Sequence, residues 1–147
     1  MERFFSFRGR LSRMAYWRTM LTLQLWSAPA FCLSLFAILA FGSAAGVAIT
    51  VVFATYMVAA VSCAVRRLHD RGKSGWWLIP MTFGPLLITA LADRLLHIHD
   101  AAAAWSGLAL SLVALFGNLW VWAEIGFKRG PLGANPYGPP AQVVGQG

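Results

Sequence analysis

One stretch of the sequence decides the fold: RRLHDRGKSGWW, residues 66–77. It is a dense polar island between long apolar runs, and its tryptophan pair leads directly into more apolar sequence. Cations beside apolar spans, followed by tryptophan, are typical of a membrane–water interface. The stretch therefore predicts a hinge between two membrane-spanning helices, and residues 66–77 are called the hinge below.

The composition favours a membrane protein of one domain, residues 1–147. Hydrophobic residues make up 59% of the chain and charged residues only 12%, whereas a soluble domain carries about 25% charged residues. The net charge of +7 is compatible with nucleic-acid binding. However, the cations lie beside apolar spans, so we expect no nucleic-acid partner. Cys32 and Cys63 fall inside apolar runs, which argues against a disulfide framework and a zinc site.

Four apolar runs predict four membrane-spanning helices, at about residues 19–42, 44–65, 76–92 and 101–123. A helix of about 20 residues crosses a hydrocarbon core of about 30 Å. Residues 1–18 form a basic, aromatic interfacial segment, and residues 124–147 form an irregular tail rich in glycine and proline. The predicted fold is an all-α, four-transmembrane-helix bundle, in which Gln24 faces another helix.

The basic residues predict the orientation of these spans. Arginines precede the first span, the hinge carries four cations, and Lys128 and Arg129 follow the last span. The first connection holds no cation and the third holds Arg94 alone. Because basic loops stay on the cytoplasmic side, we expect the hinge and both termini to be cytoplasmic.

Two stretches leave alternatives open. Pro80, Gly84 and Pro85 in the third span indicate either a helix broken at a functional site, as in transporters, or a kink absorbed by packing. We favour the kink because no ionisable residue lies inside that span. The stretch 93–100 contains two aspartates and two histidines, which indicate either a metal site or a solvated loop. We favour the loop and expect no metal, since no other loop offers further ligands.

Three motifs resemble those of the DUF805 family of small bacterial inner-membrane proteins. The hinge resembles the family's motif Arg-Arg-Leu-His-Asp-x-Gly-Lys-Ser-Gly-Trp-Trp. Residues 7–17 are similar to its opening Phe-x-Gly-Arg-x-x-Arg-x-x-Tyr-Trp, and residues 133–138 to its closing Gly-x-Asn-x-Tyr/Phe-Gly. Ala15 stands where many members carry an acid, and Arg71 where a small or polar residue is common. The resemblance implies a multi-pass protein of the bacterial inner (plasma) membrane and supplies no reaction.

In the predicted orientation all three motifs lie on the cytoplasmic side, where we expect them to pack into a cap. Asp70 is the predicted central anion, accepting from Arg10 or Arg13, while Asn135 and Tyr137 dock the tail against the hinge. Ser12 and Ser74 are predicted helix caps, and Glu124 is predicted to pair with Lys128 at i+4. The residues predicted to form the cap, or to bind lipid or a partner there, are Arg8, Arg10, Arg13, Trp17, Arg66, Arg67, His69, Asp70, Lys73, Trp76, Trp77, Asn135 and Tyr137.

Three functions fit this pattern. The first is a non-enzymatic module whose basic cap binds anionic lipid headgroups, a membrane-protein partner or a second copy of the chain. The second is a small solute or ion transporter or channel, with a broken third span near Gln24 and Asn118. The third is a membrane enzyme acting on phospholipid headgroups through His69 and Asp70. We rank them in that order, and assign no catalytic residue and no cofactor, because no nucleophile or second carboxylate lies near His69 in the sequence.

Overall fold

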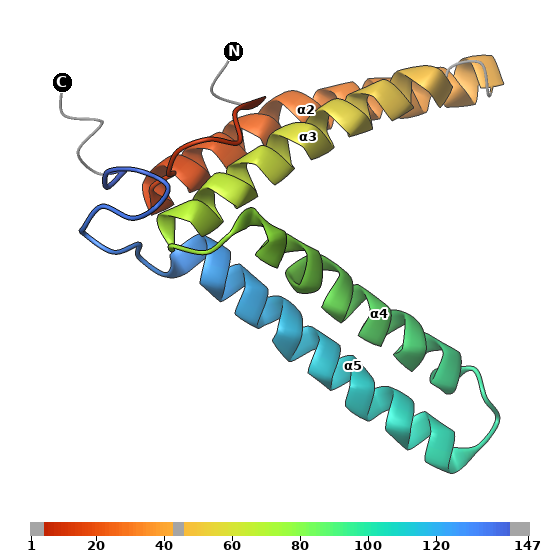
Figure 1. The fold of residues 1–147 in the computed structure, drawn as a ribbon. Coiled ribbons are helices and arrows are strands. Elements are labelled where there is room, and N and C mark those ends of the chain that lie inside the picture. Colours follow the sequence, from red (N-terminus) through yellow and green to blue (C-terminus); the bar gives the residue numbers. More distant parts are fainter. Residues whose placement is uncertain (1–4, 43–45, 142–147) are drawn as a thin grey trace.

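Two helical hairpins form the molecule, and they meet at one end (Figure 1). The computed structural model describes residues 5–42 and 46–141. Helix α2 (Arg13–Phe41) pairs with α3 (Gly46–Asp70), and α4 (Leu78–Leu96) pairs with α5 (Ala101–Trp122). A short 3-10 turn, η2 (Gly75–Trp77), precedes α4, and a π-helical turn, η3 (Ala123–Phe127), follows α5. The hairpins diverge from their shared end, so the molecule resembles a V.

The all-helical fold class is confirmed. Among the described residues, four helices are long and apolar enough to cross a membrane: Arg13–Phe41, Ile49–Asp70, Gly75–Leu96 and Ala101–Phe127. Large hydrophobic side chains such as Leu25, Trp26 and Leu39 point outward along them. In water such a surface is unfavourable, whereas lipid suits it. Instead of one closely packed bundle, the four helices form two pairs, because α3 and α4 contact each other closely only near the hinge.

Local signals set the helix ends at the hinge. Ser12 caps α2 by accepting from the backbone N–H of Ala15, at 3.3 Å. Within the hinge, Ser74 accepts from the N–H of Trp76 at 3.3 Å. Gly72 has φ +72°, a left-handed conformation that permits the reversal after α3. The predicted helix-capping roles of Ser12 and Ser74 are therefore confirmed.

Small residues hold α4 against α5. A methyl group added at Gly107 would lie 2.8 Å from Leu96 Cγ and 3.1 Å from the carbonyl oxygen of Ala92. Pro85 is buried in α4 and faces Gly117 of α5. Close approach at small residues is the usual way membrane helices pack. Helix α4 is continuous through Pro85, so the structure agrees with a third span whose proline is absorbed by packing.

One predicted boundary was wrong, while Gln24 is exposed and lines a groove whose other walls include Tyr56 of α3 and Trp122 of α5. The irregular tail does not begin at residue 124, because η3 continues the helix to Phe127 and buries Glu124 and Ile125. The predicted start of the second span at Ala44 lies outside the described residues.

A small apolar cluster joins the two hairpins. Leu68 of α3, Met81 of α4 and Ile125 of η3 are buried together, and Tyr16 of α2 packs against them. Because Leu68 belongs to the hinge, this cluster lies at the shared end of the V. The hinge is therefore the place where both hairpins are fixed to each other.

Candidate functional site: the cap at the shared end of the hairpins

Three segments far apart in the sequence meet at the shared end of the hairpins (Figure 1). They are residues 8–13 before and at the start of α2, the hinge, and residues 123–138 after α5. Their common structure is called the cap below. The hydrogen bonds that join them connect residues more than 50 positions apart.

Asp70 is one of two anions at the centre of the cap. It is the last residue of α3 and is only 4% exposed. Its Oδ1 accepts from Arg10 Nε at 3.0 Å, and its Oδ2 accepts from Arg67 Nη1. Both guanidinium groups are almost fully buried. The predicted acceptor role of Asp70 is therefore present in the structure, with Arg10 as the partner from the N-terminal segment.

Arg10 and Arg67 also hold the segment after α5. Arg10 donates to three carbonyl oxygens of this segment, those of Pro131 at 2.7 Å, Gly133 at 2.8 Å and Gly138 at 3.3 Å. Arg67 donates through Nε to the carbonyl of Ile125 at 2.8 Å, and further bonds reach the carbonyls of Leu11 and Lys128. A guanidinium has five N–H donors in a fixed plane. Each arginine therefore joins the carboxylate of Asp70 to backbone carbonyl groups of the segment after α5.

Glu124 is the second central anion, and the sequence did not reveal its full role. It is 2% exposed, at the start of the π-helical turn. Its carboxylate contacts Lys73 Nζ at 2.7 Å, Lys128 Nζ at 2.6 Å and Arg71 Nη2 at 3.2 Å. Only the Lys128 pair was predicted, and it is confirmed. The available signal was an acid at the end of an apolar span, opposite a hinge with more cations than Asp70 can pair.

The tail docks on the hinge through Asn135 and Tyr137. Asn135 Nδ2 donates to the carbonyl oxygen of His69 at 2.9 Å, and Asn135 Oδ1 accepts from the N–H of Tyr137 at 2.9 Å. The Tyr137 ring stacks on the His69 ring with centroids 3.9 Å apart and planes 4° apart. His69 and Asp70, although adjacent in sequence, therefore serve different partners.

The family comparison agrees with these motifs. The model of the family described as "Protein of unknown function (DUF805)" matches residues 4–139. The chain belongs to the DUF805 family. Neither the comparison with curated proteins nor the comparison with solved structures gave a match.

Trp17, from the opening motif of this DUF805 protein, fastens α2 to η3. Its Nε1 donates to the carbonyl of Gly126 at 3.0 Å, and its ring contacts Trp122 and Phe127. A methyl group at Gly126 would lie 2.8 Å from Trp17 Cζ2, so glycine is required for this approach. Arg13 lies above it and donates to the carbonyl of Phe127 at 3.4 Å.

The remaining predicted residues lie at the margin of the cap. Arg8 is exposed, and Arg66 is half-buried, with its carbonyl accepting from the N–H of Leu11 at 3.2 Å. Trp76 is 77% exposed and Trp77 is 48% exposed. Lys73 Nζ lies 5.3 Å from the centre of the Trp77 ring, within range of a cation–π contact. These tryptophans face outward, as interfacial anchors do.

The stretch 93–100 lies at the opposite end of α4 and α5. His97 Nδ1 lies 3.7 Å from Asp93 Oδ1, and both side chains are largely exposed. Asp100 caps α5 by accepting from the N–H of Ala103 at 2.9 Å. Within residues 5–42 and 46–141, no group of three or more histidine, cysteine or acidic side chains is placed to hold a metal ion.

Proposed function

We propose that this DUF805 protein is a non-enzymatic, multi-pass protein of the bacterial inner membrane whose cap faces the cytoplasm and binds anionic lipid headgroups. The residues that would bind them are the exposed arginines around the cap: Arg8, Arg13, Arg18 and Arg129. These four residues are called the rim below.

The division of the cations into two groups is the observation that carries the proposal. Arg10 and Arg67 are buried against Asp70, while Arg71 and Lys73 are paired with Glu124. Each of these four cations therefore has a carboxylate partner inside the protein, although the cations outnumber the two carboxylates. The rim arginines, in contrast, are exposed next to the ends of apolar helices. A cation at that level attracts an anionic membrane surface by about 1 kcal/mol each.

The orientation rests on the same distribution. The cap end carries all basic residues of the described ranges except Arg94, which lies at the far end of α4. Under the positive-inside rule the cap then faces the cytoplasm, where anionic lipids also give the surface its negative potential. The exposed Trp76 and Trp77 would lie at headgroup level.

The transporter hypothesis has less support. It depends on a break in the third span, whereas α4 continues through Pro85, and Pro80 lies in its first turn, where proline is tolerated. Asn118, which was to line a path, donates to the carbonyl of Ala114 within its own helix at 2.9 Å.

Native mass spectrometry of the purified protein tests the proposal. We expect phosphatidylglycerol to be retained more strongly than phosphatidylcholine, and this preference to weaken as salt increases. Each rim Arg→Gln substitution should lower the retention of phosphatidylglycerol. Arg94→Gln, at the far end of the molecule, is the control and should leave it unchanged. Equal retention of both lipids at low salt would exclude the proposed function.

A further inference from the structure

A polar pocket of about 270 Å³ lies beside the start of α2. Its lining includes Ser12 and Arg13 at the helix start, Arg129 from the segment after η3, and the Arg10–Asp70 pair. The buried guanidinium of Arg10 is bonded to Asp70, which also accepts from Arg67. Arg13 and Arg129, in contrast, are exposed. The pocket therefore presents two guanidinium groups to an entering anion.

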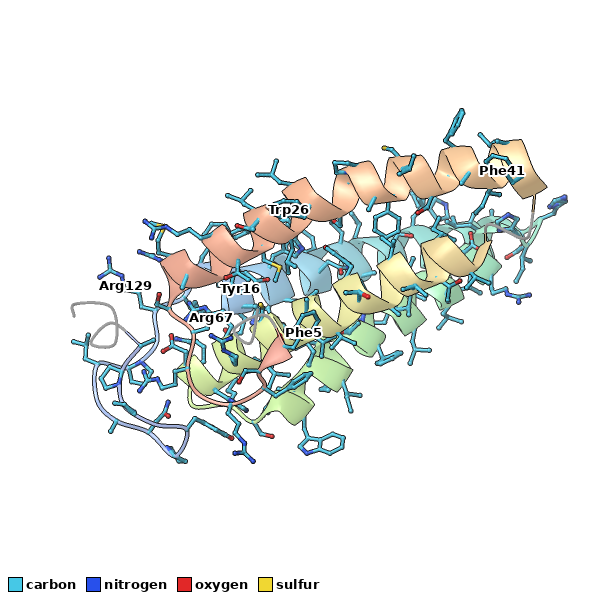
Figure 2. All side chains as sticks on the ribbon, turned by 90° about the horizontal axis from the view of Figure 1, so that it is seen from above. Phe5, Tyr16, Trp26, Phe41, Arg67 and Arg129 are labelled. Atoms are coloured by element: carbon cyan, nitrogen blue, oxygen red, sulfur yellow. The ribbon has the colours of Figure 1, made fainter. Side chains whose placement is uncertain are left out.

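A separate apolar groove of about 300 Å³ lies further along α2, toward the middle of the spans, and shares no lining residue with the pocket. Its lining includes Trp17, Met20 and Gln24 of α2 and, from the opposite side, Trp122 and Ile125. Arg13, Trp17, Met20 and Gln24 recur at intervals of three and four residues, so they share one face of α2. The cationic pocket and the apolar groove thus lie at two levels along one face of α2. Figure 2 shows Arg129 beyond the start of α2 and Tyr16, which also lines the groove, on its first turns.

We infer that this surface binds one anionic phospholipid, with its phosphate between Arg13 and Arg129 and an acyl chain in the groove. The inference rests on the proposed function and assigns it a single site. Guanidinium groups suit phosphate because they offer parallel N–H donors. The acyl chain of a membrane lipid is already in hydrocarbon, so the groove stabilises it through van der Waals packing and not through transfer from water. A soluble anion would use the arginines alone, whereas a phospholipid uses both levels.

The charge test compares two double variants that each remove two exposed arginines. In Arg13→Gln/Arg129→Gln the pocket loses both cations, and in Arg8→Gln/Arg18→Gln the rim loses two cations outside the pocket. The apparent Kd of the most tightly bound phosphatidylglycerol, measured by native mass spectrometry, should rise about tenfold or more in the first variant and less than threefold in the second. If the first variant proves unstable, Arg129→Gln and Arg18→Gln make the same comparison one charge at a time.

The groove test uses a matched pair of tryptophan substitutions. Leu21 lines the groove, and Leu25 lies one turn further along α2, outside it. Leu21→Trp should fill the groove and weaken phosphatidylglycerol binding, whereas Leu25→Trp should not. Glycerol 3-phosphate is the soluble probe, and we expect it not to displace the lipid at equal concentration.

The outcomes separate this inference from the proposed function. If the two double variants lose equal affinity while phosphatidylglycerol is still preferred, binding is spread over the rim and the single site is refuted. Displacement by glycerol 3-phosphate at equal concentration, or an unchanged affinity in Leu21→Trp, would refute the acyl-chain part. If the wild-type protein shows no preference for phosphatidylglycerol, the proposed function fails and the site fails with it.

Discussion

Asp70→Asn is the sharpest test of the cap, because it removes a charge and keeps the shape of the side chain. The carboxylate is 4% exposed and is shared by Arg10 and Arg67, whose side chains are 2% and 0% exposed. Removing one partner of a buried ion pair costs about 3–5 kcal/mol. Both arginines keep their bonds to carbonyl oxygens. We therefore expect a loss near the lower limit, about 3 kcal/mol in the free energy of unfolding.

The assay is unfolding in mixed micelles by titration with SDS, followed by timed proteolysis of the segment 128–141. Because Arg10 connects Asp70 to the carbonyls of Pro131 and Gly133, the segment should be cleaved faster in the variant. Asp93→Asn is the control, since its side chain is 66% exposed at the far end, and it should change stability by less than about 0.5 kcal/mol.

A double-mutant cycle then checks that the loss comes from the ion pair. Arg10→Gln should cost less in the Asp70→Asn background than in the wild type, with a coupling of about 0.5–3 kcal/mol. A loss below about 1 kcal/mol in Asp70→Asn, with wild-type protection of the segment, would refute the view that Asp70 holds the cap together.

Three further results are expected. Glu124→Gln should lower the free energy of unfolding by about 3 kcal/mol in the same titration, because three cations then lose a buried carboxylate. An unchanged free energy of unfolding would show that water hydrates those cations equally well. Gly130→Ala should destabilise the cap, since the new methyl group would lie 2.7 Å from Asp70 Cγ. Gly133→Ala is the control and should hardly change stability, because nothing lies within 4 Å of its methyl group. Equal effects of the two variants in the proteolysis assay would contradict this packing. A reporter enzyme fused after Lys73 should be active only in the cytoplasm, and activity only on the outer side would reverse the proposed orientation.

The sequence by itself determined the helices and the way the chain turns at the hinge. Apolar runs of spanning length define the helices, because lipid requires each span to satisfy its own backbone hydrogen bonds. The helix caps and the turn at the hinge involve residues at most three positions apart, as at Ser12, Gly72 and Ser74. Their roles can therefore be predicted from the neighbouring sequence. The joining of the three motifs at one end also followed from the sequence, since the charge pattern predicts which connections share a side.

The tertiary structure alone decided the details of the cap. Most partners of Arg10 and Arg67 are carbonyl oxygens of residues 125–138. Because every residue type has the same backbone carbonyl group, the sequence does not show which carbonyl groups accept these bonds. The burial of Glu124 depends on the π-helical turn, which brings it against the hinge. The divergence of the two hairpins depends on contacts between α3 and α4 that are limited to the hinge region. The first two features arise from pairings over more than 50 residues, which local patterns do not encode, and they determine which arginines are buried.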